Sequence, residues 1–110
     1  MSNEDTNDSN EIFWLGYCYE YGIDVDKNEN RAFTYYQKSA DMNNSNGMYQ
    51  VGHCHYLGIG VEMDKYQAFI HYKKSAELGN SMGIFKTAMC YGYGVGMKEN
   101  YCEFEYWIEE

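Results

Sequence analysis

Apolar residues recur along this chain at intervals of three or four positions, which is typical of helices that bury one face. Between residues 65 and 78 the stripe consists of Ala68, Phe69, Tyr72 and Ala76. Serine, asparagine or aspartate stands before such stretches and glycine often follows them. Because these residue types cap helix starts and helix ends, the pattern predicts short helices in pairs, joined by loops of a few residues.

The pattern returns every 36 residues. Residues 9–44 and 45–80 are identical at 14 of 36 positions, and residues 81–110 keep the key positions. We expect the first helix of each copy to be N-capped by a serine, at Ser9, Ser45 and Ser81. We expect it to end at a glycine, at Gly22, Gly58 and Gly94. The second helix is expected to start after Asn28, Asp64 and Asn100.

A two-helix unit cannot bury its own apolar face, but stacked copies can. The sequence therefore predicts an all-α protein, a right-handed α-solenoid of about three antiparallel two-helix repeats. The repeats cover about 9–44, 45–80 and 81–110, so the repeat domain spans 9–110. Residues 1–8 are expected to be a disordered acidic N-terminus.

One motif of the first copy is specific: Leu15-Gly16-x-x-Tyr19-x-x-Gly22, followed by Ala32-x-x-x-Tyr36-x-x-x-Ala40. It resembles the Sel-one-like repeat family, a relative of the tetratricopeptide repeats. The third copy departs from the family pattern, with Phe104 in place of an alanine and Ile108 in place of an aromatic residue. The resemblance implies a non-enzymatic interaction scaffold or adaptor, as in signalling or protein quality control.

Composition first points toward disorder, because Leu, Ile, Val and Phe number only 18 of 110 residues and the net charge is −9. Thirteen Tyr and seven Met supply the missing apolar area, and the excess acid lies entirely in 1–11 and 99–110. A single Arg argues against nucleic-acid binding, and the acidic balance argues against anionic membranes. With no leader peptide or long apolar run, a cytoplasmic location is expected.

The candidate binding site is a groove along the first helix of each copy, the face on which such solenoids usually hold partners. Its positions are rich in aromatic residues, which are common in binding hot spots, although some could simply fill space between helices. The partner-binding groove is expected to consist of Phe13, Tyr17, Glu20, Tyr49, His53, Tyr56, Phe85, Met89 and Tyr93.

The three histidines and four cysteines are the residues that could bind a metal ion or form disulfides. His53 and His55 stand two positions apart, so on a helix they point in different directions, and no CxxC pair exists. We therefore expect no metal site and no cofactor. The cysteines are expected to be thiols, with a bridge between Cys90 and Cys102 left open as the one alternative.

The loop Gly58-Ile59-Gly60 follows a helix rather than a strand, so it predicts a turn and not a phosphate site. The terminal acids are expected to keep exposed helix ends soluble. The alternative is that Tyr101, Phe104, Trp107 and Ile108 form an uncapped apolar face that accepts another repeat, a second subunit or a downstream segment.

The sequence thus predicts a scaffold that binds a protein or peptide of unknown identity. The alternative is a fragment or regulatory tail of a larger multi-repeat protein, such as one associated with a protein kinase. No base beside a nucleophile is visible, so an enzyme is not expected.

Overall fold

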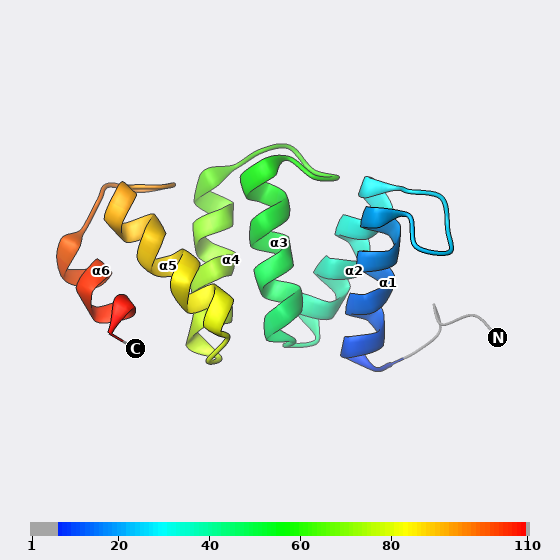
Figure 1. Cartoon of the computed structure of the whole chain (residues 1–110), viewed down its shortest axis with the longest axis horizontal. Helices are drawn as coiled ribbons and strands as arrows, with labels where there is room; N and C mark the ends of the chain where they lie inside the picture. The colour runs from blue at the N-terminus through cyan, green and yellow to red at the C-terminus, as the bar shows by residue number, and fades with distance from the viewer. Residues whose placement is uncertain (1–6, 110) are drawn as a thin grey trace.

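The computed structural model describes residues 7–109, which form six helices and no strands. The helices stand side by side along a molecule of 49 × 25 × 19 Å, with the N-terminus at one end and the C-terminus at the other (Figure 1). The predicted all-α fold of paired helices is confirmed. The helices are α1 (Ser9–Tyr21), α2 (Glu29–Asp41), α3 (Ser45–Leu57), α4 (Lys65–Glu77), α5 (Ser81–Tyr93) and α6 (Tyr101–Ile108).

The first helix of each repeat ends where predicted, at a glycine in the left-handed region of backbone space. Its start differs from the prediction by one residue. The N-caps are Asp8, Asn44 and Asn80, and the expected serines are the first helical residues instead. The predicted disordered segment 1–8 falls mostly on residues outside the described part of the chain, but Asp8 accepts a hydrogen bond from the Asn10 backbone N–H at 2.9 Å.

The asparagine caps explain this difference, because an amide accepts and donates at once. The Asn44 side-chain oxygen accepts from the Asn46 and Gly47 N–H groups at 2.9 and 3.1 Å. Its Nδ2 donates to the preceding repeat, to Ser9 Oγ at 3.0 Å and Asn10 Oδ1 at 2.7 Å. A serine hydroxyl has one proton and could not make both donations while serving as a cap. The cap therefore also joins consecutive repeats.

Within a repeat, a tyrosine of the second helix packs onto a glycine of the first. A Cβ atom at Gly16 would lie 2.7 Å from the ring of Tyr36, and one at Gly52 would lie 2.8 Å from the ring of Tyr72. Both tyrosines are buried. The absence of a glycine side chain thus lets the two helices approach closely around a large aromatic core residue.

Buried serines fasten the same helix pairs at their other end. Ser39 Oγ donates to the Ser9 carbonyl at 2.9 Å, and Ser75 Oγ donates to the Ser45 carbonyl at 2.8 Å. These hydroxyls are enclosed and already paired, so they hold the fold together and are not available as nucleophiles.

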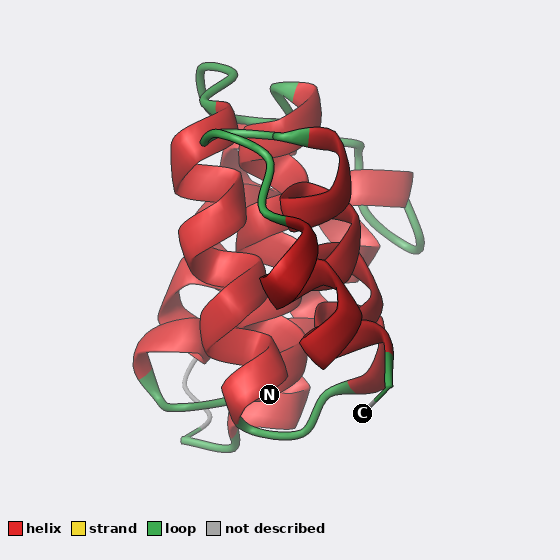
Figure 2. Ribbon diagram, turned by 90° about the vertical axis from the view of Figure 1, so that its left-hand side faces the viewer, coloured by secondary structure: helices red, strands yellow, loops and turns green. Residues whose placement is uncertain are grey.

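Consecutive repeats also meet through the loops within them. Gly60 and Gly96 have positive φ angles, and a Cβ atom at either would overlap a backbone carbonyl of the preceding repeat, that of Glu29 or Lys65. The loop at Gly58-Ile59-Gly60 is thus a packing turn, as predicted. Looking along the long axis, Figure 2 shows the helices running up and down, with loops above and below them.

The third repeat closes differently from the alternative prediction of an open apolar face. Trp107 is buried with Ala76, Ala88 and Tyr91, and Phe104 packs against Gly92. Aromatic rings large enough to reach back to α5 cover this end, so of the predicted face only Tyr101 and Ile108 stay exposed.

All four cysteines are free thiols, so Cys90 and Cys102 do not form a bridge. Cys90 is buried between helices, whereas Cys102 lies on the exposed side of α6. Among residues 7–109, no helix is both long and apolar enough to cross a membrane.

Candidate functional site

The predicted groove divides into two parts with different surroundings. Its N-terminal part is largely structural. Phe13 packs against Tyr36 with ring centroids 5.7 Å apart, and Tyr17 lies between Trp14 and Tyr21 at 5.4 and 4.7 Å. Only the outer side of this aromatic row faces solvent, because Trp14 and Tyr21 are exposed whereas Phe13 and Tyr17 are partly buried.

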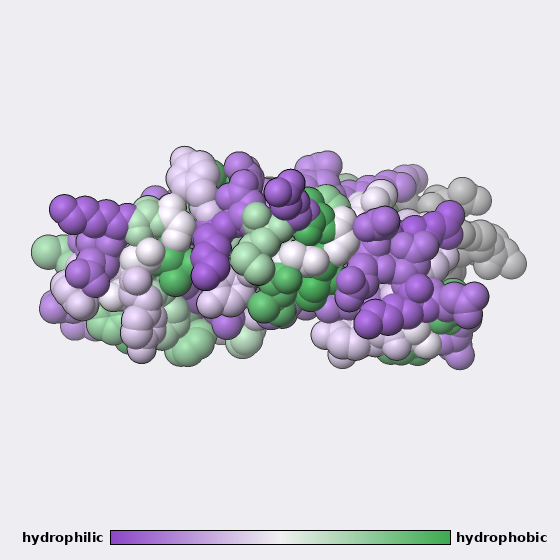
Figure 3. Space-filling view, turned by 90° about the horizontal axis from the view of Figure 1, so that it is seen from above, coloured by the Kyte–Doolittle hydropathy of each residue, from purple (hydrophilic) through white to green (hydrophobic). Residues whose placement is uncertain are grey.

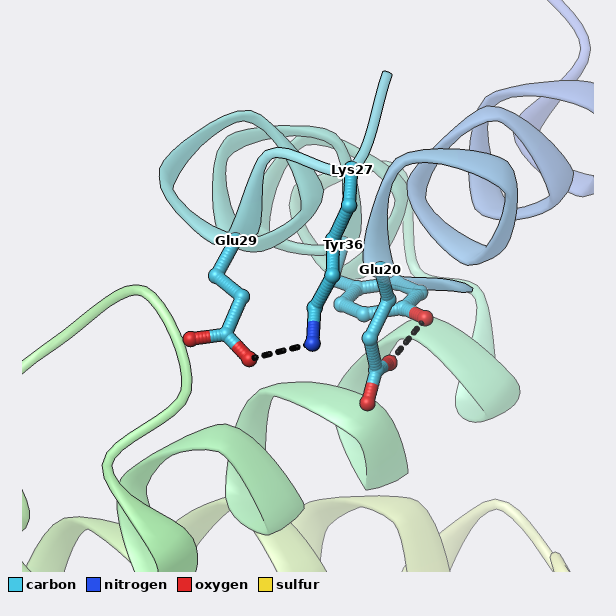
Figure 4. A network of polar contacts seen from close by, with 4 residues as sticks. All are labelled: Glu20, Lys27, Glu29 and Tyr36. Atoms are coloured by element: carbon cyan, nitrogen blue, oxygen red, sulfur yellow. Dashed lines mark hydrogen bonds and ion pairs between the residues drawn. The ribbon is translucent and has the colours of Figure 1, made fainter. Parts of the chain in front are cut away.

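Glu20 does not line a groove, contrary to the prediction. It is only 6% exposed, and its Oε1 accepts a hydrogen bond from Tyr36 Oη at 2.6 Å (Figure 4). Burial and this hydrogen bond together raise the pKa of Tyr36 far above its ordinary value, so the hydroxyl stays a donor. Helical spacing places Glu20 on the inner side of α1, and a buried partner makes that position tolerable for a carboxylate.

The middle of the groove is intermediate in character. Tyr49 is partly buried and packs on Tyr72 and His53, with ring centroids 5.6 and 6.0 Å apart. Burial raises the pKa of Tyr49 and lowers that of His53. These two side chains therefore belong to the wall of the groove rather than to its exposed surface.

The C-terminal part of the groove forms a pocket of about 250 Å³ between the second and third repeats. Four of the predicted residues meet there. Phe85 and Tyr93 are 50% and 77% exposed, while Tyr56 and Met89 are partly buried. Seen from above, hydrophilic side chains cover the α1–α2 end of the molecule, and apolar patches interrupt this cover over α3 to α5 (Figure 3). The pocket is lined by Tyr56, Tyr72, Phe85, Lys86, Met89, Cys90, Tyr93 and Val95.

The polar side chains that line this mostly apolar pocket are those of Tyr72, Lys86 and Cys90, besides the hydroxyls of Tyr56 and Tyr93. Tyr72 is 1% exposed, and its buried hydroxyl has no hydrogen-bond partner within residues 7–109. Burial raises the pKa of Tyr72, so this hydroxyl keeps its proton and remains a donor. Burial also raises the pKa of the Cys90 thiol to about 11, against a smaller opposing effect of the Lys86 ammonium. Tyr72 and Lys86 are therefore two of the hydrogen-bond donors in the pocket lining, and the Cys90 thiol is inert.

The predicted groove omitted Tyr72 and Lys86. A signal for Lys86 was present, because it is the only Lys or Arg in the first helices of the three repeats. Tyr72 gave none on its own, since Tyr36 at the same repeat position looks identical in the sequence.

A larger hollow of about 520 Å³ lies along α2, lined by polar side chains that include Arg31, Thr34 and Lys38. Arg31 Nη1 is held by Tyr19 Oη at 2.9 Å, and the Arg31 guanidinium lies 5.3 Å from the centre of the Tyr19 ring. All three named lining residues are exposed, so this hollow lacks a buried polar group that would orient a ligand.

The histidines pack as aromatic rings. His55 stacks on His71 with centroids 5.6 Å apart, and Phe33 meets His55 edge-on at 5.5 Å. In the described part of the chain, no three His, Cys, Asp or Glu side chains lie close enough together to hold a metal ion.

Two of these histidines predict a pH dependence of stability. Burial is the main cause that lowers the pKa values of His53 and His71 below their ordinary value of about 6.5. The unfolded chain thus binds more protons in this range, so stability is fully present above about pH 6.5 and falls as the pH drops through the lower folded-state values. We expect urea unfolding between pH 7 and 5 to show this loss, and a His53→Gln/His71→Gln variant to lose less. Parallel curves for the two proteins would contradict the prediction.

Comparison with known proteins places this architecture in a family. The sequence matches the Sel1 repeat at residues 12–44, 45–80 and 81–101. The chain belongs to the Sel1 repeat family. The first two segments cover the pairs α1–α2 and α3–α4, and the third covers α5 and ends at the first residue of α6. The predicted resemblance is confirmed. A search of curated proteins found no match for this chain.

Solved structures of Sel1 repeat proteins share the fold. A Sel1 repeat protein of Oxalobacter formigenes superposes with a TM-score of 0.93 at 25% identity, over 99% of this chain and 45% of that one. A protective antigen of uropathogenic Escherichia coli gives 0.89 at 27% identity, over 94% and 22%. Cysteine-rich protein B of Helicobacter pylori gives 0.69 at 31% identity, over 73% and 60%. The chain therefore spans less than two thirds of each of these Sel1 repeat proteins.

Proposed function

We propose that this Sel1 repeat scaffold binds a partner protein or peptide along the first helices of its repeats, with the pocket between the second and third repeats as the main contact. The observation that supports this most is the exposure of Phe85 and Tyr93 at the rim of an apolar pocket. Exposed aromatic residues beside a hollow are typical of binding surfaces, because they bring a large contact area at little entropic cost.

The proposed role is non-enzymatic. Burial raises the pKa values of the Cys54 and Cys90 thiols to about 12 and 11, which makes both poor nucleophiles. Ser39 and Ser75 are buried and already donate to backbone carbonyls. These features favour packing over chemistry at the residues that an acyl-transfer reaction would need.

We further propose that the protein acts as an adaptor in signalling or protein quality control, in the cytoplasm. The alternative proposal is a segment of a larger multi-repeat protein, such as one associated with a protein kinase. This alternative is supported by two of the solved relatives, of which this chain spans only 45% and 22%. Kinase motifs in the same continuous reading frame would favour the alternative.

Peptides selected from a random display library against the purified chain provide the test. A Phe85→Ala/Tyr93→Ala variant should weaken their binding about tenfold or more, because hot-spot aromatics carry much of the energy of an interface. Since both side chains are largely exposed, the thermal unfolding temperature should stay nearly unchanged.

A Met63→Ala/Tyr66→Ala variant is the matched control. These side chains are 57% and 56% exposed but lie outside the pocket, so binding should change by less than about twofold. Equal losses in both variants, or a library that yields no specific peptide, would refute the proposed site.

A further inference from the structure

The first two repeats differ at one pair of positions that otherwise correspond. Tyr36 and Tyr72 occupy the same place in their repeats, 36 residues apart, and both are buried. The partner of Tyr36 is Glu20, whereas the residue 36 positions after Glu20 is Tyr56. Tyr72 has therefore lost the carboxylate that its counterpart uses, and its hydroxyl has no partner in the described structure.

Tyr56, the residue that corresponds to Glu20, lines the pocket together with Tyr72. At the junction between the first and second repeats, the Glu20 carboxylate acts on His53 and Cys54. It raises the pKa of His53, which burial lowers by more, and it adds to the larger rise that burial causes in the pKa of Cys54. One repeat later, the corresponding residues Met89 and Cys90 line the pocket of about 250 Å³ together with Tyr72. The junction between the first and second repeats thus holds the Glu20 carboxylate, whereas the junction between the second and third repeats holds a pocket.

A positive charge accompanies the opening. Lys86 lines the pocket, and 36 residues earlier the same helix position holds the neutral Gln50. Within residues 7–109, the side-chain ion pair joins Lys27 to Glu29 at 3.7 Å (Figure 4). Lys86 therefore has no carboxylate partner among these residues. A buried hydroxyl and an ammonium that line the same pocket and both lack a partner favour an anionic acceptor.

We propose that the pocket between the second and third repeats binds a glutamate side chain of a partner peptide, whose carboxylate accepts a hydrogen bond from Tyr72 and pairs with Lys86. Glu20 on Tyr36 is the internal template for this contact. Phe85, Met89 and Tyr93 would enclose apolar side chains on either side of the glutamate. This inference rests on the proposed function and adds to it the chemical class of the ligand.

The probe is an acetylated and amidated heptapeptide, Ser-Leu-Phe-Glu-Leu-Phe-Ser, in which the glutamate is the only carboxylate. A second peptide carries glutamine in its place. We expect calorimetry to show the glutamate peptide binding about tenfold more tightly, because a charge-assisted hydrogen bond is roughly twice as strong as a neutral one and a gain of about 1.4 kcal/mol is tenfold in affinity. A third peptide, with glutamine inside and a free C-terminus, tests whether a terminal carboxylate serves instead.

Variants of the protein localise the effect. Tyr72→Phe and Lys86→Gln should each remove most of the preference for glutamate. Lys74→Gln, at an exposed lysine outside the pocket, should leave the preference intact. Tyr56→Glu should place a carboxylate of the chain itself on Tyr72, as Glu20 does on Tyr36, which would raise the thermal unfolding temperature and block the peptide.

Equal binding of the glutamate and glutamine peptides, binding of neither, a preference that survives Tyr72→Phe, or stronger binding of the free C-terminal peptide would each overturn the proposal. The proposed function fails separately. Library peptides that need Phe85 and Tyr93 but carry no acid would leave the scaffold role standing and remove only the glutamate site.

Discussion

Gly60→Asp is expected to lower the free energy of unfolding by about 3 kcal/mol or more, because an added side chain has no room at this junction. The Cβ atom would overlap the Glu29 carbonyl oxygen and press on the Phe33 side chain of the preceding repeat. Backbone atoms cannot rotate out of the way as a flexible side chain can, so the first and second repeats would have to separate. Urea unfolding followed by circular dichroism measures the loss.

The first repeat provides the control for backbone strain. Asp24 occupies the position that corresponds to Gly60, and its φ of 62° is close to the 69° of Gly60. Aspartate thus already adopts this conformation in the same chain, at a site where it is exposed. Asp24→Gly should change stability by less than about 1 kcal/mol. A Gly60→Asp protein as stable as the wild type would show that the junction is looser than the structure indicates.

The second large effect is expected from Tyr36→Phe, which should cost about 3 kcal/mol. The substitution removes the hydroxyl that donates to the buried Glu20 carboxylate at 2.6 Å, and it leaves Tyr21 as the other hydroxyl that hydrogen-bonds to this carboxylate. Removing a hydrogen-bond donor from a buried carboxylate is expensive, because the carboxylate keeps its desolvation cost and loses part of its compensation. Chemical denaturation at pH 7 tests this directly.

Tyr72→Phe is its matched control. The same atom is removed from the same repeat position, but here the hydroxyl has no partner. Removing a buried unsatisfied donor should leave stability unchanged or raise it by up to about 1 kcal/mol. Equal destabilisation by the two substitutions would mean that Tyr72 has a partner in solution, and that the two junctions do not differ as described.

Much of the fold could be predicted from sequence because its signals are local. The 36-residue period, the glycines that end the first helices and the capping residues of the second helices each act within a few positions of the chain. The N-caps of the first helices lie one residue before the predicted serines, as at Asn44 instead of Ser45 in the second repeat. Serine and asparagine are both good caps, and the choice between them depends on a hydrogen bond to another repeat, which a local pattern does not contain.

The candidate site was less predictable, since it depends on which face of a helix meets which neighbour. The analogy with tetratricopeptide packing predicts Glu20 in the groove, but the structure buries it, and hydrogen bonds from Tyr36 and Tyr21 make this burial tolerable. The alternative prediction of an open face exposes Trp107, but this side chain turns inward onto α5. Both corrections concern contacts between helices, which repeat spacing alone does not determine.

Each helix of this molecule contacts only the next one or two helices along the chain, so no contact ties the ends together. Cooperativity then passes from repeat to repeat, and the terminal pair, whose second helix has 8 residues instead of 13, has the weakest support. The pocket lies across the junction that holds this pair. A ligand bound there would act as a clamp, and the order of the last repeat would rise with occupancy of the site.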